Sequence, residues 1–135
     1  MQDNVQTGTT PRLMLWAGRG LSALVVLFLI FDGVIKVMRD PHVDQAMKPL
    51  GYPLDLSPTI GVIELACLVL YAIPSTAILG AVLMTGLLGG AIASHLRVGD
   101  PLFSHTLFGV YVGAMAWGGL YLRDARLRSL FPLRR

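Results

Sequence analysis

The chain alternates between long apolar runs and short polar connections, and this pattern predicts four membrane-spanning helices. The runs cover residues 13–38, 58–73, 76–96 and 101–122, approximately. A membrane helix needs about 20 apolar residues to cross about 30 Å of hydrocarbon, and only the second run is shorter than that. Because lipid offers the backbone no hydrogen bonds, each run is expected to be helical. The predicted fold class is therefore all-α, a four-transmembrane-helix bundle.

Prolines mark where these helices are expected to begin and end. Ser57 precedes Pro58 and Asp100 precedes Pro101, and a small polar residue followed by proline is typical of a helix start. Pro74 separates the second run from the third, which predicts a tight hairpin between them.

The composition excludes an ordinary soluble domain. Of the 135 residues, 54% are hydrophobic and 14% are charged, and the mean hydropathy is +0.65. Soluble domains average about 25% charged residues, so this chain has too few polar groups to cover a soluble core. We expect a short polar tail over residues 1–12, a membrane domain over 13–128 and a basic tail over 129–135.

Basic side chains predict the orientation, because positively charged segments next to membrane spans stay in the cytoplasm. An even number of spans puts both termini on one side, so we expect both termini in the cytoplasm of a multi-pass cell-membrane protein (the inner membrane in a bacterium). The basic tail is short and adjoins a span, which favours a topology signal and no nucleic-acid binding. The basic residues on this side are Arg12, Arg19, Arg123, Arg126, Arg128, Arg134 and Arg135.

Small residues and aromatic residues predict how the bundle packs. Small residues recur every four positions in the third run, and such rows let membrane helices approach closely. These rows consist of Ala81, Thr85, Gly89 and Ala93, and of Gly86, Gly90 and Ser94. Tyrosine and tryptophan favour the membrane interface, which makes interfacial anchors of Trp16, Tyr52, Tyr71, Trp117 and Tyr121.

Ionisable residues gather at one predicted depth. With the termini inside, four helices bring Asp32, Lys36, Glu64, His95 and His105 to the outer part of the bundle. Charges in membrane spans are costly and usually face the interior, where they mark functional sites. No comparable cluster is expected at the cytoplasmic end. The pattern therefore predicts one inward-facing polar site.

Each of these residues also has a structural interpretation. Lys36 could extend to the outer surface, Arg97 could bind the last carbonyls of its helix, and His105 could lie at the interface. Asp32 and Glu64 could form structural ion pairs. A metal site is not predicted, because the HxxxH or ExxH spacing typical of metal ligands is absent.

Several segments resemble the DoxX-like family of small four-helix membrane proteins. The resemblance extends from about Leu13 onward, and its most specific part is GGAIASHLRVGDPLFSH; the other segments are IFDGVIKV, LGYP, IGVIELACLVLYAIPSTAILGA and WGGLYLRD. The family takes its name from a thiosulfate–quinone oxidoreductase, and relatives are linked to redox or maturation complexes. The resemblance points to Asp32, Glu64, His95 and His105 as candidate catalytic residues, and to Lys36, Arg97 and Asp100 as candidate ligand-binding residues.

Two functions from different classes follow. The first is a membrane-embedded small-molecule site, such as a component of a quinone-linked oxidoreductase. No flavin, haem or nucleotide motif is present, so a quinone or a partner subunit would carry the electrons. The second is a non-catalytic scaffold or assembly factor that docks a partner protein. The first predicts a concave pocket, and the second predicts a filled bundle.

Overall fold

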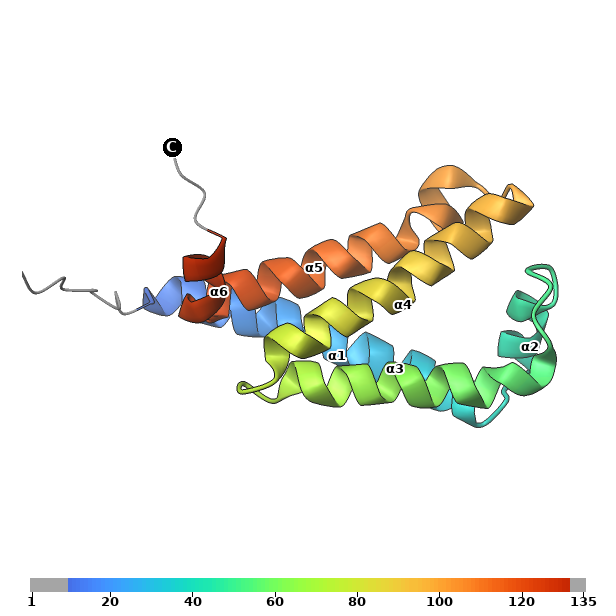
Figure 1. Cartoon of the computed structure of the whole chain (residues 1–135), viewed down its shortest axis with the longest axis horizontal. Helices are drawn as coiled ribbons and strands as arrows, with labels where there is room; N and C mark the ends of the chain where they lie inside the picture. The colour runs from blue at the N-terminus through green and yellow to red at the C-terminus, as the bar shows by residue number, and fades with distance from the viewer. Residues whose placement is uncertain (1–9, 132–135) are drawn as a thin grey trace, which may run out of the picture.

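The computed structural model describes residues 10–131 as a succession of helices (Figure 1). No strand occurs in this part of the chain, which confirms the all-α class. Arg134 and Arg135 of the predicted basic tail lie outside the described residues. In chain order the elements are α1 (Arg12–Val37), α2 (Pro41–Met47), the 3₁₀-helix η1 (Leu54–Leu56), α3 (Ser57–Ala72), α4 (Ala77–Val98), the π-helical turn η2 (Leu102–Thr106), α5 (Phe108–Arg123) and α6 (Ala125–Leu130).

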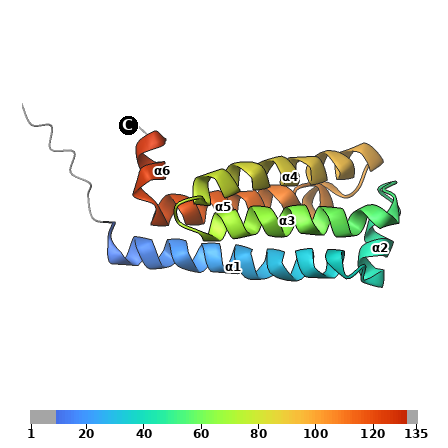
Figure 2. The ribbon, with the colours of Figure 1, turned by 60° about the horizontal axis from the view of Figure 1, so that its bottom comes forward.

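Four long helices form a bundle in which each packs against two neighbours. Both α1 and α4 contact α3 and α5, so α1 and α4 occupy opposite corners (Figure 2). α2 lies where α1 ends and α3 begins (Figure 1). We call this end of the bundle, which also holds the last turn of α4, the loop end. The opposite end, with the start of α1 and with α6, is the terminal end.

The outer surface of the bundle is apolar. Three helical segments are long and apolar enough to cross a membrane: α1, α4 and the stretch from Leu54 to Ala72. Large apolar side chains point outward from them, with Leu27 66% exposed, Phe31 65% and Val62 58%. Apolar surface of this extent marks contact with lipid or a partner rather than water. The chain is therefore a membrane protein.

The first three predicted runs agree with α1, α3 and α4 to within two residues. The fourth differs, because residues 101–122 do not form one continuous α-helix. The N–H groups of Thr106 and Leu107 bond to the carbonyls of Pro101 and Leu102, five residues back. This wider turn precedes α5, which has 16 residues and begins at Phe108.

Two predicted helix caps are wrong. η1 runs directly into α3, so Ser57 lies inside helical backbone, and its hydroxyl donates to the carbonyl of Lys36 at 2.8 Å. The carboxylate of Asp100 makes no cap for η2 and instead binds the ring of His95, with Oδ2 and Nδ1 2.5 Å apart. In both cases a tertiary or local partner replaces the expected backbone N–H.

Two short helices were not predicted, although both carry a start signal. Asp40 precedes Pro41 and accepts from the N–H of His42 at 2.9 Å, which caps α2. Hydrogen bonds from the backbone and ring of His42 hold the pKa of Asp40 below its usual value. Asp124 caps α6 in the same way. Both helices escaped prediction because they are too short to contain a long apolar run.

The predicted rows of small residues in α4 pack only in part: Ala81 and Ser94 are buried, but the glycines of these rows do not bring helices together. A Cβ added at Gly86, Gly89 or Gly90 would meet no atom within 4 Å. The close approach between α3 and α4 occurs at Gly80, where an added Cβ would lie 2.2 Å from the backbone nitrogen of Tyr71. Sequence spacing identifies a small-residue face, but only the fold decides whether a neighbour packs on it.

Candidate functional site

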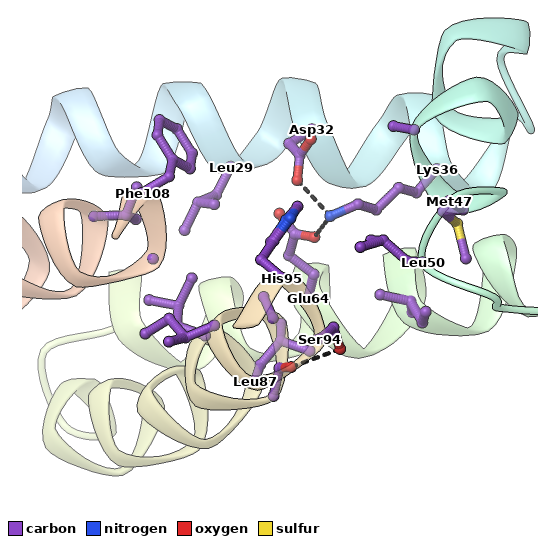
Figure 3. Close-up of a pocket in the computed structure, with 18 of the residues that line it drawn as sticks. Leu29, Asp32, Lys36, Met47, Leu50, Glu64, Leu87, Ser94, His95 and Phe108 are labelled. Atoms are coloured by element: carbon purple, nitrogen blue, oxygen red, sulfur yellow. Dashed lines mark hydrogen bonds and ion pairs between the residues drawn. The ribbon is translucent and has the colours of Figure 1, made fainter. Parts of the chain in front are cut away.

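An acid–base cluster links α1 to α3 near the loop end (Figure 3). The Nζ of Lys36 donates to Asp32 Oδ2 at 2.5 Å and to Glu64 Oε2 at 2.7 Å. Asp32 and Lys36 share a helix face because they are four residues apart. Glycines allow α3 to come close enough for Glu64 to reach them: a Cβ at Gly61 would lie 2.7 Å from the carbonyl oxygen of Gly33.

Glu64 is the most deeply buried member of this cluster. Its side chain is 3% exposed, compared with 31% for Asp32 and 22% for Lys36. One of its oxygens, Oε1, is buried and has no hydrogen-bond partner. An unpaired buried acceptor is costly, and in native proteins it usually has a specific cause.

A cavity of about 620 Å³ opens beside this cluster, between the four long helices and α2. Its walls are mainly apolar, and Asp32, Lys36 and Glu64 form a polar patch on one side (Figure 3). Other lining residues include Phe28, Leu29, Ile35, Val43, Met47, Ile60, Met84, Leu88, Ile92, Phe108 and Val112. An apolar cavity with a few converging polar groups is the usual form of a small-molecule site.

Three histidines line the same cavity, and two of them, His95 and His105, lie side by side. The Nδ1 of His95 is held by Asp100 Oδ2, which fixes the orientation of the ring. This pairing depends on Gly99, whose backbone has φ of 71° and turns the chain back so that Asp100 lies beside the last turn of α4. The ring of His105 lies edge-on to that of His95, with centroids 6.0 Å apart, and its Nδ1 is 2.7 Å from the hydroxyl of Ser104.

The structure thus brings Asp32, Lys36, Glu64, His95 and His105 around one cavity. The other two candidates lie outside its lining. Asp100 acts on the cavity only through His95, and Arg97 donates from Nη2 to the carbonyl of Leu50. Arg97 follows His95 by two residues on the helix, so its side chain points elsewhere, toward the loop before η1.

The pattern of apolar runs does not predict the contribution of α2 and the loop after it. His42, Val43 and Met47 line the cavity, as does Tyr52, which had been expected to anchor at the interface. The Tyr52 hydroxyl bonds to that of Ser94 on α4 at 2.5 Å. The Asp-Pro pair at the start of α2 is the one local signal for this helix, in a region whose sequence otherwise predicts a loop.

A second polar network, different in kind from the acid–base cluster, lies at the terminal end. Tyr71, predicted to be an interfacial anchor, is fully buried there, and its hydroxyl donates to the carbonyl of Ala116 at 2.6 Å. Its oxygen also lies 2.9 Å from Ser22 Oγ, to which Arg123 Nε donates at 3.0 Å. Serine and tyrosine within apolar runs gave no sign of this network.

The cavity offers hydrogen-bonding and ionisable side chains to a bound molecule. Within residues 10–131, no three His, Cys, Asp or Glu side chains come together in a way that could hold a metal ion. Cys67, in α3, is buried and forms no disulfide. The groups that line the cavity are two carboxylates, one ammonium, three histidine rings and the hydroxyls of Tyr52 and Ser94.

Comparison with known proteins adds the family. No curated protein and no solved structure matches the chain significantly. The sequence model of the DoxX-like family matches residues 20–119, which include the candidate side chains at positions 32, 36, 64, 95, 97, 100 and 105. Because this match covers most of the chain, the protein belongs to the DoxX-like family.

Proposed function

We propose that this protein crosses the membrane four times and binds a small lipophilic molecule in its loop-end cavity. The observation that carries the proposal is the buried, unpartnered Oε1 of Glu64 beside an apolar cavity. A bound molecule with a polar head would satisfy that oxygen, while its apolar body would contact the cavity walls.

The size of the cavity supports binding over a purely structural role. Its volume of about 620 Å³ lies within the range of about 300–1,000 Å³ that is usual for small-molecule sites. A scaffold that docks a partner on its outer face has no need of a hollow interior. The scaffold alternative would have been favoured by a filled bundle.

The roles of individual residues follow from their contacts. Glu64 and Asp32 would exchange protons with the bound molecule, and Lys36 would hold both carboxylates in place. His95 would shuttle protons near neutral pH with Asp100 as its positioning residue. His105 is exposed and would serve at the mouth of the cavity.

A redox version of the proposal is the quinone-linked oxidoreductase component that the family resemblance implied. A quinone has an apolar body and ring oxygens that take up protons on reduction. Asp32 and Glu64 would supply these protons, and a partner subunit would supply the electrons.

The proposed topology has both termini in the cytoplasm. It rests on the basic side chains at the terminal end, among them Arg12, Arg123 and Arg126. A Cys67→Ser background allows single cysteines to be placed at the exposed positions Gln45 and Ser129. In whole cells an impermeant thiol reagent should label Gln45→Cys and leave Ser129→Cys unlabelled. The reverse labelling would overturn this orientation.

Binding can be tested by filling the cavity. Gly90 lines it and has open space beyond its Cα, so Gly90→Leu should reduce its volume without a clash. Gly89→Leu is the matched control, because Gly89 is exposed and lies outside the lining. Lipophilic molecules that co-purify with each variant are identified by mass spectrometry. We expect a molecule present with wild type and with Gly89→Leu, and lost with Gly90→Leu. Identical extracts from all three would contradict the proposal.

A further inference from the structure

The charges around the cavity do not balance. Lys36 is the one lysine or arginine among the described residues that line it, and it is shared by Asp32 and Glu64. Each of the three lining histidines has a partner outside the cluster: His95 pairs with Asp100, His42 pairs with Asp40, and the ring of His105 bonds to the hydroxyl of Ser104. The cluster on α1 and α3 therefore has one carboxylate more than it has cations.

The geometry identifies where the missing positive charge is needed. Lys36 binds Oε2 of Glu64, whereas Oε1 has no partner. A buried carboxylate without full compensation is unfavourable in a low-dielectric interior. Either a proton or a cation from a ligand completes the cluster, and both would act at Oε1.

The walls near Glu64 indicate how such a ligand arrives. From their hairpin at the terminal end, α3 and α4 diverge toward the loop end (Figure 1). The cavity is lined along this divergence by Glu64 and Ile60 of α3 and by Gly86 and Gly90 of α4. Both glycines are exposed and have open space beyond the Cα. The α4 side of this part of the cavity is therefore free of side chains at positions 86 and 90.

Resting on the proposed function, we propose that the ligand is a lipophilic amine that enters from lipid between α3 and α4 and places its ammonium head against Glu64 Oε1. The head donates hydrogen bonds to the unpartnered oxygen and supplies the missing positive charge. The apolar chain lies along the wall that includes Met84, Leu88 and Ile92. A carboxylate head would add a third negative charge to the cluster and is excluded by repulsion.

Three probes with the same chain and different heads separate charge from hydrophobicity: decylamine, decanol and decanoate. Native mass spectrometry of the purified protein at neutral pH measures the occupancy of each probe. We expect decylamine to bind roughly tenfold more tightly than decanol, since a charged hydrogen bond is stronger than a neutral one. Decanoate should bind least. Gly90→Leu should weaken the binding of both decylamine and decanol, which locates them in the cavity.

Charge-removing variants test the role of the carboxylates. Glu64→Gln and Asp32→Asn each make the cluster neutral and should abolish the preference for decylamine over decanol. Asp55→Asn is the control, because Asp55 is exposed and outside the cavity. Equal binding of decylamine and decanol by wild type would overturn the amine proposal but leave a neutral-ligand site intact. If Gly90→Leu leaves the binding of every probe unchanged, both the amine proposal and the proposed function are overturned.

Discussion

The two ends of the bundle each hold a buried polar cluster, but the clusters differ in how completely they are satisfied. At the terminal end, Tyr71, Ser22 and Arg123 bond to one another and to backbone carbonyls. The guanidinium of Arg123 also lies over the Tyr71 ring, 5.2 Å from its centroid. At the loop end, Glu64 keeps one oxygen unpaired beside a cavity.

Helix packing explains this difference. At the terminal end α1 and α5 are in close contact: a Cβ at Gly18 would lie 2.7 Å from the carbonyl oxygen of Gly119. One at Gly119 would lie 2.6 Å from Ser22 Oγ, so no space is left between α1 and α5 for another molecule. Toward the loop end, the glycines of α4 face open space instead. The charged cluster also lies at a close contact, between α1 and α3 at Gly33 and Gly61, so it is the open side toward α4 that leaves room for a bound molecule.

The largest expected effect comes from removing the cation at each end. Lys36→Met leaves Asp32 and Glu64 without their shared partner, and breaking a buried ion pair costs about 3–5 kcal/mol. Arg123→Met leaves neutral acceptors unpaired, which costs about 1–3 kcal/mol. The free energy of unfolding of each variant is measured in detergent by circular dichroism. Adding Glu64→Gln to Lys36→Met should recover part of the lost free energy of unfolding. Equal losses for Lys36→Met and Arg123→Met would contradict the difference between the two clusters.

The packing contrast is tested within α4. Gly80→Ala forces a methyl group against the backbone of Tyr71, and overpacking of this kind costs about 1–3 kcal/mol. Gly89→Ala meets no neighbour and should stabilise the helix by about 0.5–1 kcal/mol. The measurement is the unfolding midpoint of each variant in the same detergent. We expect the unfolding midpoint to fall for Gly80→Ala and to rise for Gly89→Ala. Changes in the same direction would contradict the difference in packing at these two positions.

Tyr71→Phe tests whether the terminal-end network is purely structural. The variant keeps the ring and removes the hydroxyl, which bonds to Ser22 and Ala116. The free energy of unfolding should fall by about 1 kcal/mol. Occupancy of the cavity, measured by native mass spectrometry with decylamine, should remain at the wild-type value. A loss of occupancy would show that the two ends are coupled.

The smallest expected effect is a pH dependence at the terminal end. Partial burial acts to raise the pKa of Asp124, but hydrogen bonds from the side chain and backbone of Arg126 outweigh it and lower that pKa. Because the pKa is lower in the folded protein, ionised Asp124 stabilises the fold at any pH above its pKa in the unfolded chain, which is about 4. This stabilisation is lost as the pH falls below that value and through the folded pKa. Asp124→Asn retains a capping oxygen and should flatten the change in unfolding midpoint between pH 6 and pH 3. An unchanged profile would mean that other carboxylates dominate.

Three of the long helices were predictable because each depends on a local property of the chain. Long apolar runs gave α1, α3 and α4 to within two residues, and the Asp32–Lys36 pair followed from four-residue spacing. The break before α5 was not predictable in this way. Proline at position 101 indicated a helix start, but it did not specify that the first turn would be π-helical.

The residues of the candidate site were predicted in part. Depth in the membrane indicated Asp32, Lys36, Glu64, His95 and His105, since counting along each helix is enough to estimate depth. The same count could not separate His95 from Arg97, because rotation of the helix about its axis decides which side chain faces the cavity. His42 and Tyr52 were missed because their place depends on how α2 folds back over the bundle.

By itself, the sequence determined that this chain is an all-helical membrane protein of the DoxX-like family with ionisable residues inside its apolar segments. These are properties of composition, periodicity and motif, which need no long-range contact. Only the tertiary structure decided that Lys36 is shared by two carboxylates, that Tyr71 is buried, and that α3 and α4 diverge to leave a cavity. The physical reason is that rotation and separation of packed helices depend on side chains far apart in the sequence, and no local pattern records them.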